Sequence, residues 1–386
     1  LIYLYSGFYD NHSLSDFIPD SNFIWLTNND FPNLSIIVTN NQMFYYYDYS
    51  DNWIDHKNIE LFNSTHDIEY IEYSKLIELI NTYNQVFSLP KIDKRINLNN
   101  FNKLDLTYII SYCHEKRCVK STQEITYIYQ ACKYTGDAIL YALKLFKDNN
   151  YQYCHLLIND YIHYLNKMNI DYLAFHPICT TGKDNNIIHS NNYNVKIKKD
   201  DLLLLDIGCK YKFYCSDITR TFPISGKFTK KQLAIYNVVL KMNKLGIILS
   251  NDNISISYIE NKCREQLYES LLKLNLIFPT DNDSIKRYIT KLFMPHSISH
   301  SIGIDVHDTI NTDILRNNMV ITIEPGLYFY DYQIDHPNIN NKIWNKYKQV
   351  GGIRIEDVVL INNDTPRVLS NFQKESNEIE NLINLI

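Results

Sequence analysis

The segment from Leu202 to Phe222, LLLLDIGCKYKFYCSDITRTF, begins with an apolar run that ends in Asp206 and returns through Tyr, Phe and Cys to Asp217. An apolar run followed by turn-compatible residues predicts a buried strand, and the return predicts its hairpin partner. A two-residue loop at Tyr211-Lys212 would place the two carboxylates directly opposite each other, with Cβ atoms about 5 Å apart. Two carboxylates at that distance repel each other and lose hydration, which indicates cations between them. We therefore expect a pair of metal ions at this hairpin.

Four other segments each bring a polar side chain to an apolar stretch. They are IIH with His189, MPHSISHSIGIDVHD with His296, His300 and His307, VITIEPGLY with Glu324, and GGIRIEDVV with Arg354 and Glu356. Taken singly, each has an ordinary structural explanation, such as a turn or a salt bridge. Two Asp, one His and two Glu that emerge together from apolar strands are too many charges to bury without cations. Oxygen ligands with one imidazole favour Mn²⁺ first, then Co²⁺, Fe²⁺ or Zn²⁺.

The composition excludes several classes of protein. A chain of 386 residues can form two domains, and its net charge of −5 gives no indication of a nucleic-acid or membrane partner. No apolar run approaches the ~20 residues that a membrane span needs. The 8 cysteines show no CxxC pairing, which indicates a reducing compartment and hence the cytoplasm. The chain does not begin with Met, and we expect part of its N-terminal domain to be missing.

Residues 1–110 are predicted to form a smaller α/β domain. Short strand-like runs alternate with turn residues, and one helical stripe follows them. The predicted strands are 22–26, 34–38 and 43–47, the predicted helix is 74–83, and the predicted linker is 91–103. His12, His56 and His66 are isolated here and are expected to be ordinary surface or turn residues.

The remaining chain alternates amphipathic helices with the strands described above. Ser121 and Glu124 fit a capping box at the start of a helix, and further helices are expected at 154–168, 229–247 and 255–274. A glycine-rich phosphate loop is absent from the sequence, which disfavours a nucleotide-binding fold.

The D-x10-D hairpin, the H-x3-H-x6-H segment, the IEPG strand and the GGIRIED strand resemble, in this order, the pita-bread metallopeptidases. That family includes aminopeptidase P, prolidase and methionine aminopeptidase. The resemblance covers residues 115–386 and is strongest to eukaryotic-type prolidase, an Xaa-Pro dipeptidase, in FMPHSISHSIGIDVHD, SDITRTFPISGKFT and EPGLYFYDYQID. It implies an α/β (α+β) chain with an N-terminal α/β domain (1–110) and a pita-bread catalytic domain (111–386), whose curved, mostly antiparallel sheet is covered by helices. It also implies a homodimer.

The resemblance further implies the ligands of two divalent metal ions, which are Asp206, Asp217, His300, Glu324 and Glu356. Asp206 would chelate one ion and His300 with Glu324 the other. Asp217 and Glu356 would bridge both ions, and Thr219 would orient Asp217.

The same resemblance implies hydrolysis of the bond before proline in Xaa-Pro dipeptides by a hydroxide that bridges the two ions. Glu324 would relay the proton to the leaving amine. His296 and His307 would donate hydrogen bonds to the oxyanion or the substrate backbone. His189 and Arg354 are candidates for binding the substrate's terminal carboxylate.

One departure from the family pattern concerns substrate length. The segment between His307 and Glu324 is shorter than in animal prolidases, which carry an extra arginine there for the substrate carboxylate. Asp313 stands at the expected position of that arginine, and Arg316 lies three residues further on. Because a carboxylate clamp excludes longer peptides, the alternative prediction is an Xaa-Pro aminopeptidase that acts on longer, proline-containing peptides. A further hypothesis is that Arg316 or Arg354 binds the substrate carboxylate in place of the missing arginine.

A third hypothesis is a peptide-binding protein that keeps the fold without catalysis. The complete set of predicted ligands favours the enzyme over this hypothesis.

Overall fold

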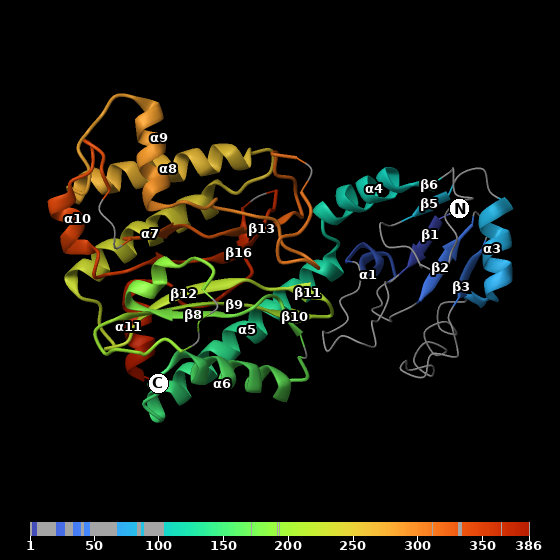
Figure 1. Ribbon diagram of the computed structural model, residues 1–386, viewed down its shortest axis with the longest axis horizontal. Coiled ribbons are helices and arrows are strands. Elements are labelled where there is room, and N and C mark those ends of the chain that lie inside the picture. The colour runs from blue at the N-terminus through green and yellow to red at the C-terminus, as the bar shows by residue number, and fades with distance from the viewer. Residues whose placement is uncertain are drawn as a thin grey trace. The chain divides into compact units, whose positions relative to one another are not determined.

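Figure 1 shows the computed structural model of the chain. The structure describes residues 2–5, 21–27, 34–39, 42–46, 68–82, 86–88, 104–170, 172–190, 192, 194–310, 312–330, 334–363 and 365–385. The chain divides into two compact units, Leu1–Arg117 and Cys118–Ile386. The domain boundary expected after residue 110 falls inside helix α4 (Leu106–Cys118).

The described part of the first unit contains a mixed sheet with strand order β4-β3-β2-β1-β5-β6. Strands β1, β2 and β3 pair antiparallel, whereas β4, β5 and β6 join by parallel pairing. The strands are β1 (Ile2–Tyr5), β2 (Ser35–Val38), β3 (Met43–Tyr46), β4 (Glu69–Tyr70), β5 (Val86–Ser88) and β6 (Leu104–Asp105). The described helices before α4 are α1 (Ser21–Thr27) and α3 (Tyr73–Thr82).

Most of the secondary structure predicted in the described part of this unit is confirmed. Strands β2 and β3 match the predicted runs, and α3 buries Leu76 and Ile80 on its apolar face. The strand predicted at 22–26 is wrong, because these residues form helix α1. A short apolar run fits either structure, and here it packs Phe23 against Leu34 and Ile36. The three isolated histidines and the linker 91–103 lie outside the described residues.

The second unit combines helices with short antiparallel sheets. Its helices are α5 (Thr122–Asp148), α6 (Cys154–Lys167), η2 (Gly182–Asn186, a 3₁₀-helix), α7 (Lys230–Leu249), α8 (Ile256–Lys273), α9 (Asp283–Phe293), α10 (Asn341–Tyr347) and α11 (Ser376–Leu385). Its strands are β7 (Tyr172–Leu173), β8 (Ile178–Thr181), β9 (Leu202–Ile207), β10 (Cys209–Tyr211), β11 (Tyr214–Cys215), β12 (Ile218–Pro223), β13 (Val320–Ile323), β14 (Gly326–Leu327), β15 (Ile353–Arg354), β16 (Asp357–Leu360) and β17 (Arg367–Val368). The described strand pairs of this unit are antiparallel.

Helices cover the sheets of this unit from two sides. Helices α5 and α6 lie on one side, and α7 and α8 lie on the other (Figure 1). The capping box predicted at Ser121 and Glu124 is confirmed, and Thr229 and Gln232 form a second one at the start of α7. In the described part of the chain, every helix is either too short or too polar to cross a membrane.

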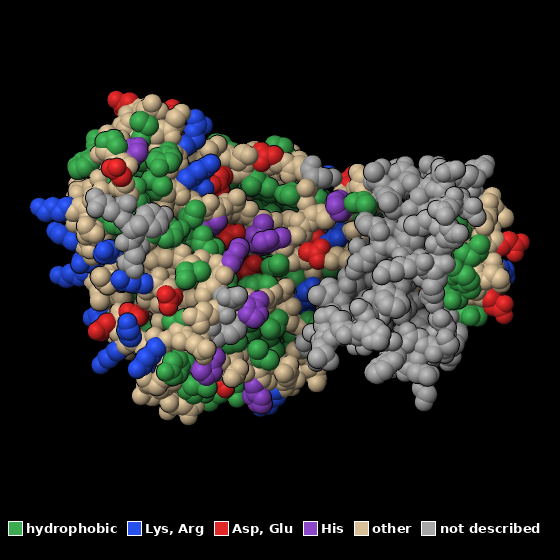
Figure 2. Space-filling model, viewed as in Figure 1, with side chains coloured by type: hydrophobic (Ala, Val, Ile, Leu, Met, Phe, Trp, Pro, Cys, Tyr) green, Lys and Arg blue, Asp and Glu red, His purple; other side chains and the backbone are tan. Residues whose placement is uncertain are grey.

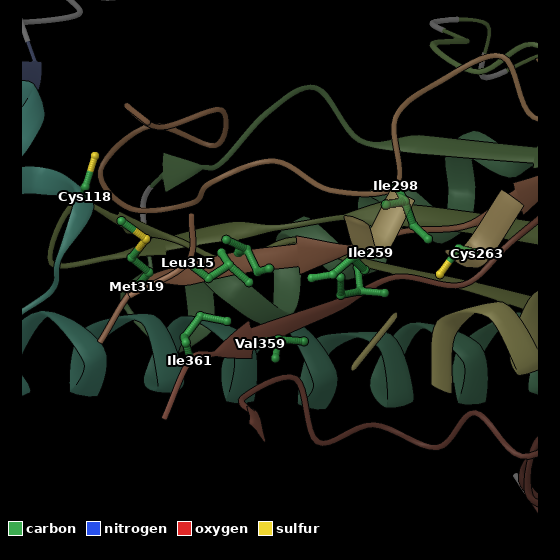
Figure 3. Packing of buried hydrophobic residues seen from close by; sticks show 10 residues of the cluster. Cys118, Ile259, Cys263, Ile298, Leu315, Met319, Val359 and Ile361 are labelled. Atoms are coloured by element: carbon green, nitrogen blue, oxygen red, sulfur yellow. The ribbon is translucent and has the colours of Figure 1, made fainter. Parts of the chain in front are cut away.

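A buried apolar cluster fills the space between α8 and the strands β13 and β16 (Figure 3). Ile259 and Cys263 of α8 face Ile321 of β13 and Val359 of β16. Ile298, which belongs to the histidine-rich segment, is fully buried in the same cluster. The core therefore anchors the histidine-rich segment beside the strand that leads to the predicted Glu324 ligand.

The central hairpin forms, but in a different register from the expected one. Asp206 of β9 lies opposite Thr219 of β12. The turn is Lys212-Phe213, with φ of 48° and 71°, as two-residue hairpin turns require. The loop predicted at Tyr211-Lys212 is therefore wrong by one residue. As a result, the residue opposite Asp206 is Thr219, two positions after the expected Asp217. A difference of two residues keeps each side chain on its face, so Asp217 still shares a face with Asp206.

Candidate metal centre

A cavity of about 770 Å³ opens in the second unit. Figure 2 shows histidine and acidic side chains gathered in a hollow on this face. The walls bring together eight of the nine predicted site residues, which are His189, Asp206, Asp217, His296, His300, His307, Glu324 and Glu356. The ninth, Arg354, does not line the cavity.

Strand ends deliver the four carboxylates to the cavity. Asp206 lies near the end of β9, Asp217 precedes β12, Glu324 follows β13, and Glu356 lies between β15 and β16. Apolar neighbours bury the strands, while the polar residue at each end turns into the hollow.

His300 reaches the carboxylates because its segment pairs with β13. The Thr322 N–H donates to the His300 carbonyl over 2.8 Å, and the Glu324 N–H donates to the Ile298 carbonyl over 2.8 Å. His300 Nε2 consequently lies 3.5 Å from Asp217 Oδ2 and 3.7 Å from both Glu324 Oε1 and Glu356 Oε1. The ligand atoms of Asp217, His300 and Glu356 all lie within 4.8 Å of one another.

Three of the carboxyl groups have raised pKa values. Burial raises the pKa of Asp217 well above its usual range, and the charge of Glu356 adds to this. Burial and Glu356 also raise the pKa of Glu324 to about 8. Burial raises the pKa of Asp206 although the Arg354 charge opposes it. These groups resist being charged together, because each loses water and faces like charge.

Hydrogen bonds shift the pKa values of His300 and Glu356 in the direction opposite to the effect of burial. Burial alone would lower the pKa of His300, but its hydrogen bonds to Asp217 and Glu356 raise it well above the usual value. Burial alone would raise the pKa of Glu356, but hydrogen bonds from His300 and Thr219 lower it. A positive charge is thus favoured at the centre of the cluster.

The donor set fits divalent cations. Asp206 Oδ1 and Asp217 Oδ1 are buried, and neither has a hydrogen-bond partner among the residues that the structure describes. Buried carboxylate oxygens without a partner are costly unless a cation binds them. The four carboxylates and one imidazole suit hard or borderline divalent ions.

Arg354 occupies a different place from the one expected of a substrate ligand. It is 2% exposed, and its Nη2 donates to Asp206 Oδ2 over 2.6 Å. Its Nη1 donates to the Tyr328 hydroxyl over 2.9 Å, and its Nε contacts Thr219 Oγ1 at 3.4 Å. The guanidinium is therefore directed at protein groups behind the cavity wall, and this geometry does not support the predicted carboxylate clamp.

His296 also differs from its expected role as a donor to the substrate. Its Nδ1 lies 2.8 Å from the Ser297 carbonyl, which can only accept, so Nδ1 carries the proton. Its Nε2 then accepts a hydrogen bond from the Tyr328 hydroxyl over 2.9 Å. Burial and the Arg354 charge lower the pKa of His296 to about 4, consistent with a neutral ring. Both ring nitrogens of His296 are thus hydrogen-bonded to protein groups rather than directed at a substrate.

Thr219 contacts a different carboxylate from the predicted one. Its hydroxyl donates to Glu356 Oε2 over 2.7 Å rather than to Asp217. The register of the hairpin explains the change, since Thr219 lies opposite Asp206 and next to the strand that carries Glu356.

His189 and His307 lie on the cavity wall with exposed rings. The centroids of the His307 and His300 rings are 4.3 Å apart in an edge-on arrangement. Burial and the charge of His300 lower the pKa of His307. Both rings are accessible to a molecule that enters the cavity.

The sequence interpretation missed Tyr328, which joins Arg354 to His296. A signal was present, because a tyrosine in an apolar segment four residues after Glu324 must find a partner for its hydroxyl once it is buried. It also missed the apolar wall formed by Phe175, Ile188 and Val306. No periodic pattern marks these three residues, since each comes from a separate loop.

Curated relatives match most of the chain. The chain is 32% identical over 322 residues to a probable Xaa-Pro aminopeptidase of Botryotinia fuckeliana, covering 76% of this chain and 69% of that protein. It is 31% identical over 276 residues to the Xaa-Pro aminopeptidase of Escherichia coli, covering 70% of this chain and 60% of that protein.

Solved structures share the fold over the whole chain. Aminopeptidase PepP of Pseudomonas aeruginosa superposes with a TM-score of 0.85 at 21% identity, covering 100% of this chain and 94% of that one. A putative aminopeptidase P of Bacillus anthracis gives a TM-score of 0.82 at 22% identity with the same coverage. The model of metallopeptidase family M24 matches residues 126–363. The predicted family and fold class are confirmed, and the chain belongs to metallopeptidase family M24, the pita-bread metallopeptidases.

Proposed function

We propose that this protein is a divalent-metal-dependent Xaa-Pro aminopeptidase, which removes the first residue from peptides that carry proline second. The dipeptidase activity that the sequence favoured has less support than this alternative. The relatives described above carry the name Xaa-Pro aminopeptidase.

The observation that carries the proposal is the charge of the cavity wall. Among the residues that the structure describes, the wall includes histidines, carboxylates and apolar side chains but no Lys or Arg. A Lys or Arg near the metal centre suits the C-terminal carboxylate of a dipeptide better than the imidazole of His189 does. Arg354 is bound to Asp206 and Tyr328, and Arg316 does not line the cavity. A peptide that continues beyond proline needs no such cation.

The residues of the chain have separable tasks in this reaction. Asp206, Asp217, His300, Glu324 and Glu356 would hold two divalent ions, which supply Lewis acidity and lower the pKa of a water molecule. We infer Mn²⁺ as the first candidate because the donor set is rich in oxygen.

Proton transfer and substrate orientation belong to the side chains. Glu324 faces the cavity and can carry a proton to the leaving imino nitrogen. His307 and His189 present exposed rings that can hydrogen-bond the substrate backbone. Phe175, Ile188 and Val306 offer an apolar surface that suits a pyrrolidine ring and excludes water.

The test compares three substrates with the purified protein, before and after addition of Mn²⁺. They are Gly-Pro, its amide Gly-Pro-NH₂, and Gly-Pro-Pro-Ala. We expect metal-dependent release of glycine from the tetrapeptide and the amide, with little from the free dipeptide. Asp217→Asn serves as the inactive control, and Asp160→Asn, on α6 beside Tyr151, as a matched variant that keeps activity.

Cleavage of the free dipeptide alone would establish a dipeptidase and contradict the proposal. Metal binding without cleavage of any substrate would favour the peptide-binding protein. The homodimer and the cytoplasmic location stay predictions.

A further inference from the structure

The loop 301–308 follows His300 and contains His307, and its two end residues, Ser301 and Asp308, are hydrogen-bonded to each other. The Asp308 N–H donates to the Ser301 carbonyl over 3.0 Å, and the Ser301 hydroxyl donates to the Asp308 carbonyl. We call this Ser301–Asp308 pairing the neck of the loop. It places the His300 and His307 rings side by side, with centroids 4.3 Å apart. The orientation of His307 in the cavity therefore depends on how firmly the neck is held.

The other end of the loop is held by the central hairpin. The Cys215 N–H donates to the Gly303 carbonyl over 2.7 Å, and Lys210 Nζ donates to the Ile304 carbonyl over 3.0 Å. The loop is thus fixed to β10 and β11 at its tip. Ser301 pairs with Ile321 of β13 at the neck, which leaves the Asp308 side of the neck to be held from elsewhere.

Lys120 supplies that hold through a buried ion pair. Its Nζ lies 3.0 Å from Asp308 Oδ2, and the two side chains are 1% and 2% exposed. The loop backbone closes over the pair, because a Cβ at Gly303 would lie 2.0 Å from Asp308 Oδ2 and 3.1 Å from Lys120 Cε. The ion pair is therefore shielded from solvent.

The backbone of Lys120 is itself immobilised by the core. The Lys120 N–H donates to the Asn318 carbonyl over 2.9 Å, and Val119 forms a β-bridge with Met319. Cys118 packs in the same apolar cluster as Met319 (Figure 3). The segment 118–120 is therefore a rigid support from which Lys120 reaches the neck.

We propose that Lys120 is a positioning residue, which orients His307 for the substrate by holding Asp308. This inference rests on the proposed function, in which His307 contacts the peptide. Without the ammonium group, the buried Asp308 carboxylate would lose this ion pair, and the neck would open to hydrate the carboxylate. His307 would then lose its fixed orientation, whereas the backbone segments that carry the predicted metal ligands would keep their positions.

The experiment compares Lys120→Met, Asp308→Asn and the double variant with the wild type. The matched control is Lys147→Met, which removes an ammonium group bonded to the Ile383 carbonyl at the C-terminal helix. Hydrogen exchange of loop 301–308, Mn²⁺ affinity by calorimetry, and kcat and KM for Gly-Pro-Pro-Ala are measured for each.

We expect faster amide exchange in the loop and a fall in kcat of about 10- to 100-fold in each single variant, because a small misplacement costs this much. Mn²⁺ affinity should stay within about threefold of the wild type, because His300 keeps its backbone pairing with β13 through the Thr322 N–H and the Ser301–Ile321 bridge. The double variant should lose no more than the worse single variant, because the two residues act through each other. The control should match the wild type.

Wild-type exchange and kcat in Lys120→Met would overturn the proposal, as would losses that multiply in the double variant. Asp308→Asn is nearly isosteric and keeps the test open should Lys120→Met fold poorly. A wild type that cleaves no peptide would refute the proposed function, and loop exchange would still decide whether Lys120 holds the neck.

Discussion

At the level of single residues, two of the buried carboxylates divide their oxygens between the protein and the cavity. Asp206 Oδ2 accepts from Arg354 and Asp217 Oδ2 faces His300, while the second oxygen of each has no partner in the described part of the chain. One oxygen thus fixes the side chain and the other is available to an ion. This arrangement distinguishes a metal site from a structural salt bridge, in which both carboxylate oxygens would have hydrogen-bond partners from the protein.

Replacing Asp217 by Asn should weaken metal binding. The change removes the negative charge and one ligand oxygen, so Mn²⁺ affinity is expected to fall by at least about 100-fold, the upper end of what lesser changes around metal sites cost. Calorimetric titration measures it, with Asp160→Asn as the control. Retention of both ions with full activity would contradict the ligand assignment.

Replacing Thr219 by Val should act on the same site through Glu356. The hydroxyl donates to Glu356 Oε2 over 2.7 Å, so its loss frees that carboxylate to rotate. We expect Mn²⁺ affinity to fall by about 10- to 100-fold. Thr126→Val, at an exposed position of α5, is the control, and equal affinities for the two variants would argue against this role.

At the level of elements, the β9–β12 hairpin determines where the two aspartates lie. Gly208 connects β9 to β10, and beside it the Ser216 N–H donates to the Cys209 carbonyl over 3.0 Å. A Cβ at Gly208 would lie 2.0 Å from the Ser216 carbonyl oxygen. Only glycine allows this approach, which holds Asp206 and Asp217 on the two strands.

Substituting Gly208 by Ala should therefore destabilise the hairpin by about 1–3 kcal/mol, as overpacking does, and weaken Mn²⁺ binding. Gly136→Ala is the matched control, because Gly136 lies inside helix α5 and a Cβ there would make an ordinary contact with Phe372 at 3.4 Å. Alanine there should raise stability by about 0.4–1 kcal/mol. Thermal unfolding measures both, and a neutral Gly208→Ala would disprove the packing explanation.

At the level of the whole molecule, each of the two units contains its own apolar clusters. The first unit buries Phe23 and Leu34 in one cluster and Leu76 in another, whereas the second buries Ile298 and Val359 beside the metal centre. The predicted ligands all belong to the second unit. Metal binding should therefore stabilise that unit selectively.

Removal of metal by a chelator should lower the melting temperature of the second unit alone. An ion present at 100 times its Kd stabilises the folded state by about 2.7 kcal/mol, which corresponds to several degrees. Calorimetry on wild type and Asp217→Asn, each with and without Mn²⁺, measures this effect. A shift that persists in Asp217→Asn would place the bound ion elsewhere.

The local patterns of the sequence were sufficient for much of the fold. Helices α3, α5, α6, α7 and α8 follow from apolar periodicity, and the caps at Ser121 and Thr229 follow from residue type. Helix α1 was mistaken for a strand because four consecutive apolar residues fit both structures, and only packing against β2 decides between them.

The sequence by itself determined the family, the fold class and the set of acidic and histidine residues that meet at the cavity. These depend on residue type and spacing along strands, which are local properties. Only the tertiary structure decided the partners of Arg354, Thr219, His296 and Lys120, because each contacts a residue distant in the chain or depends on the register of the hairpin. A hydrogen bond needs an orientation as well as a residue type, and that orientation exists only once the strands have packed.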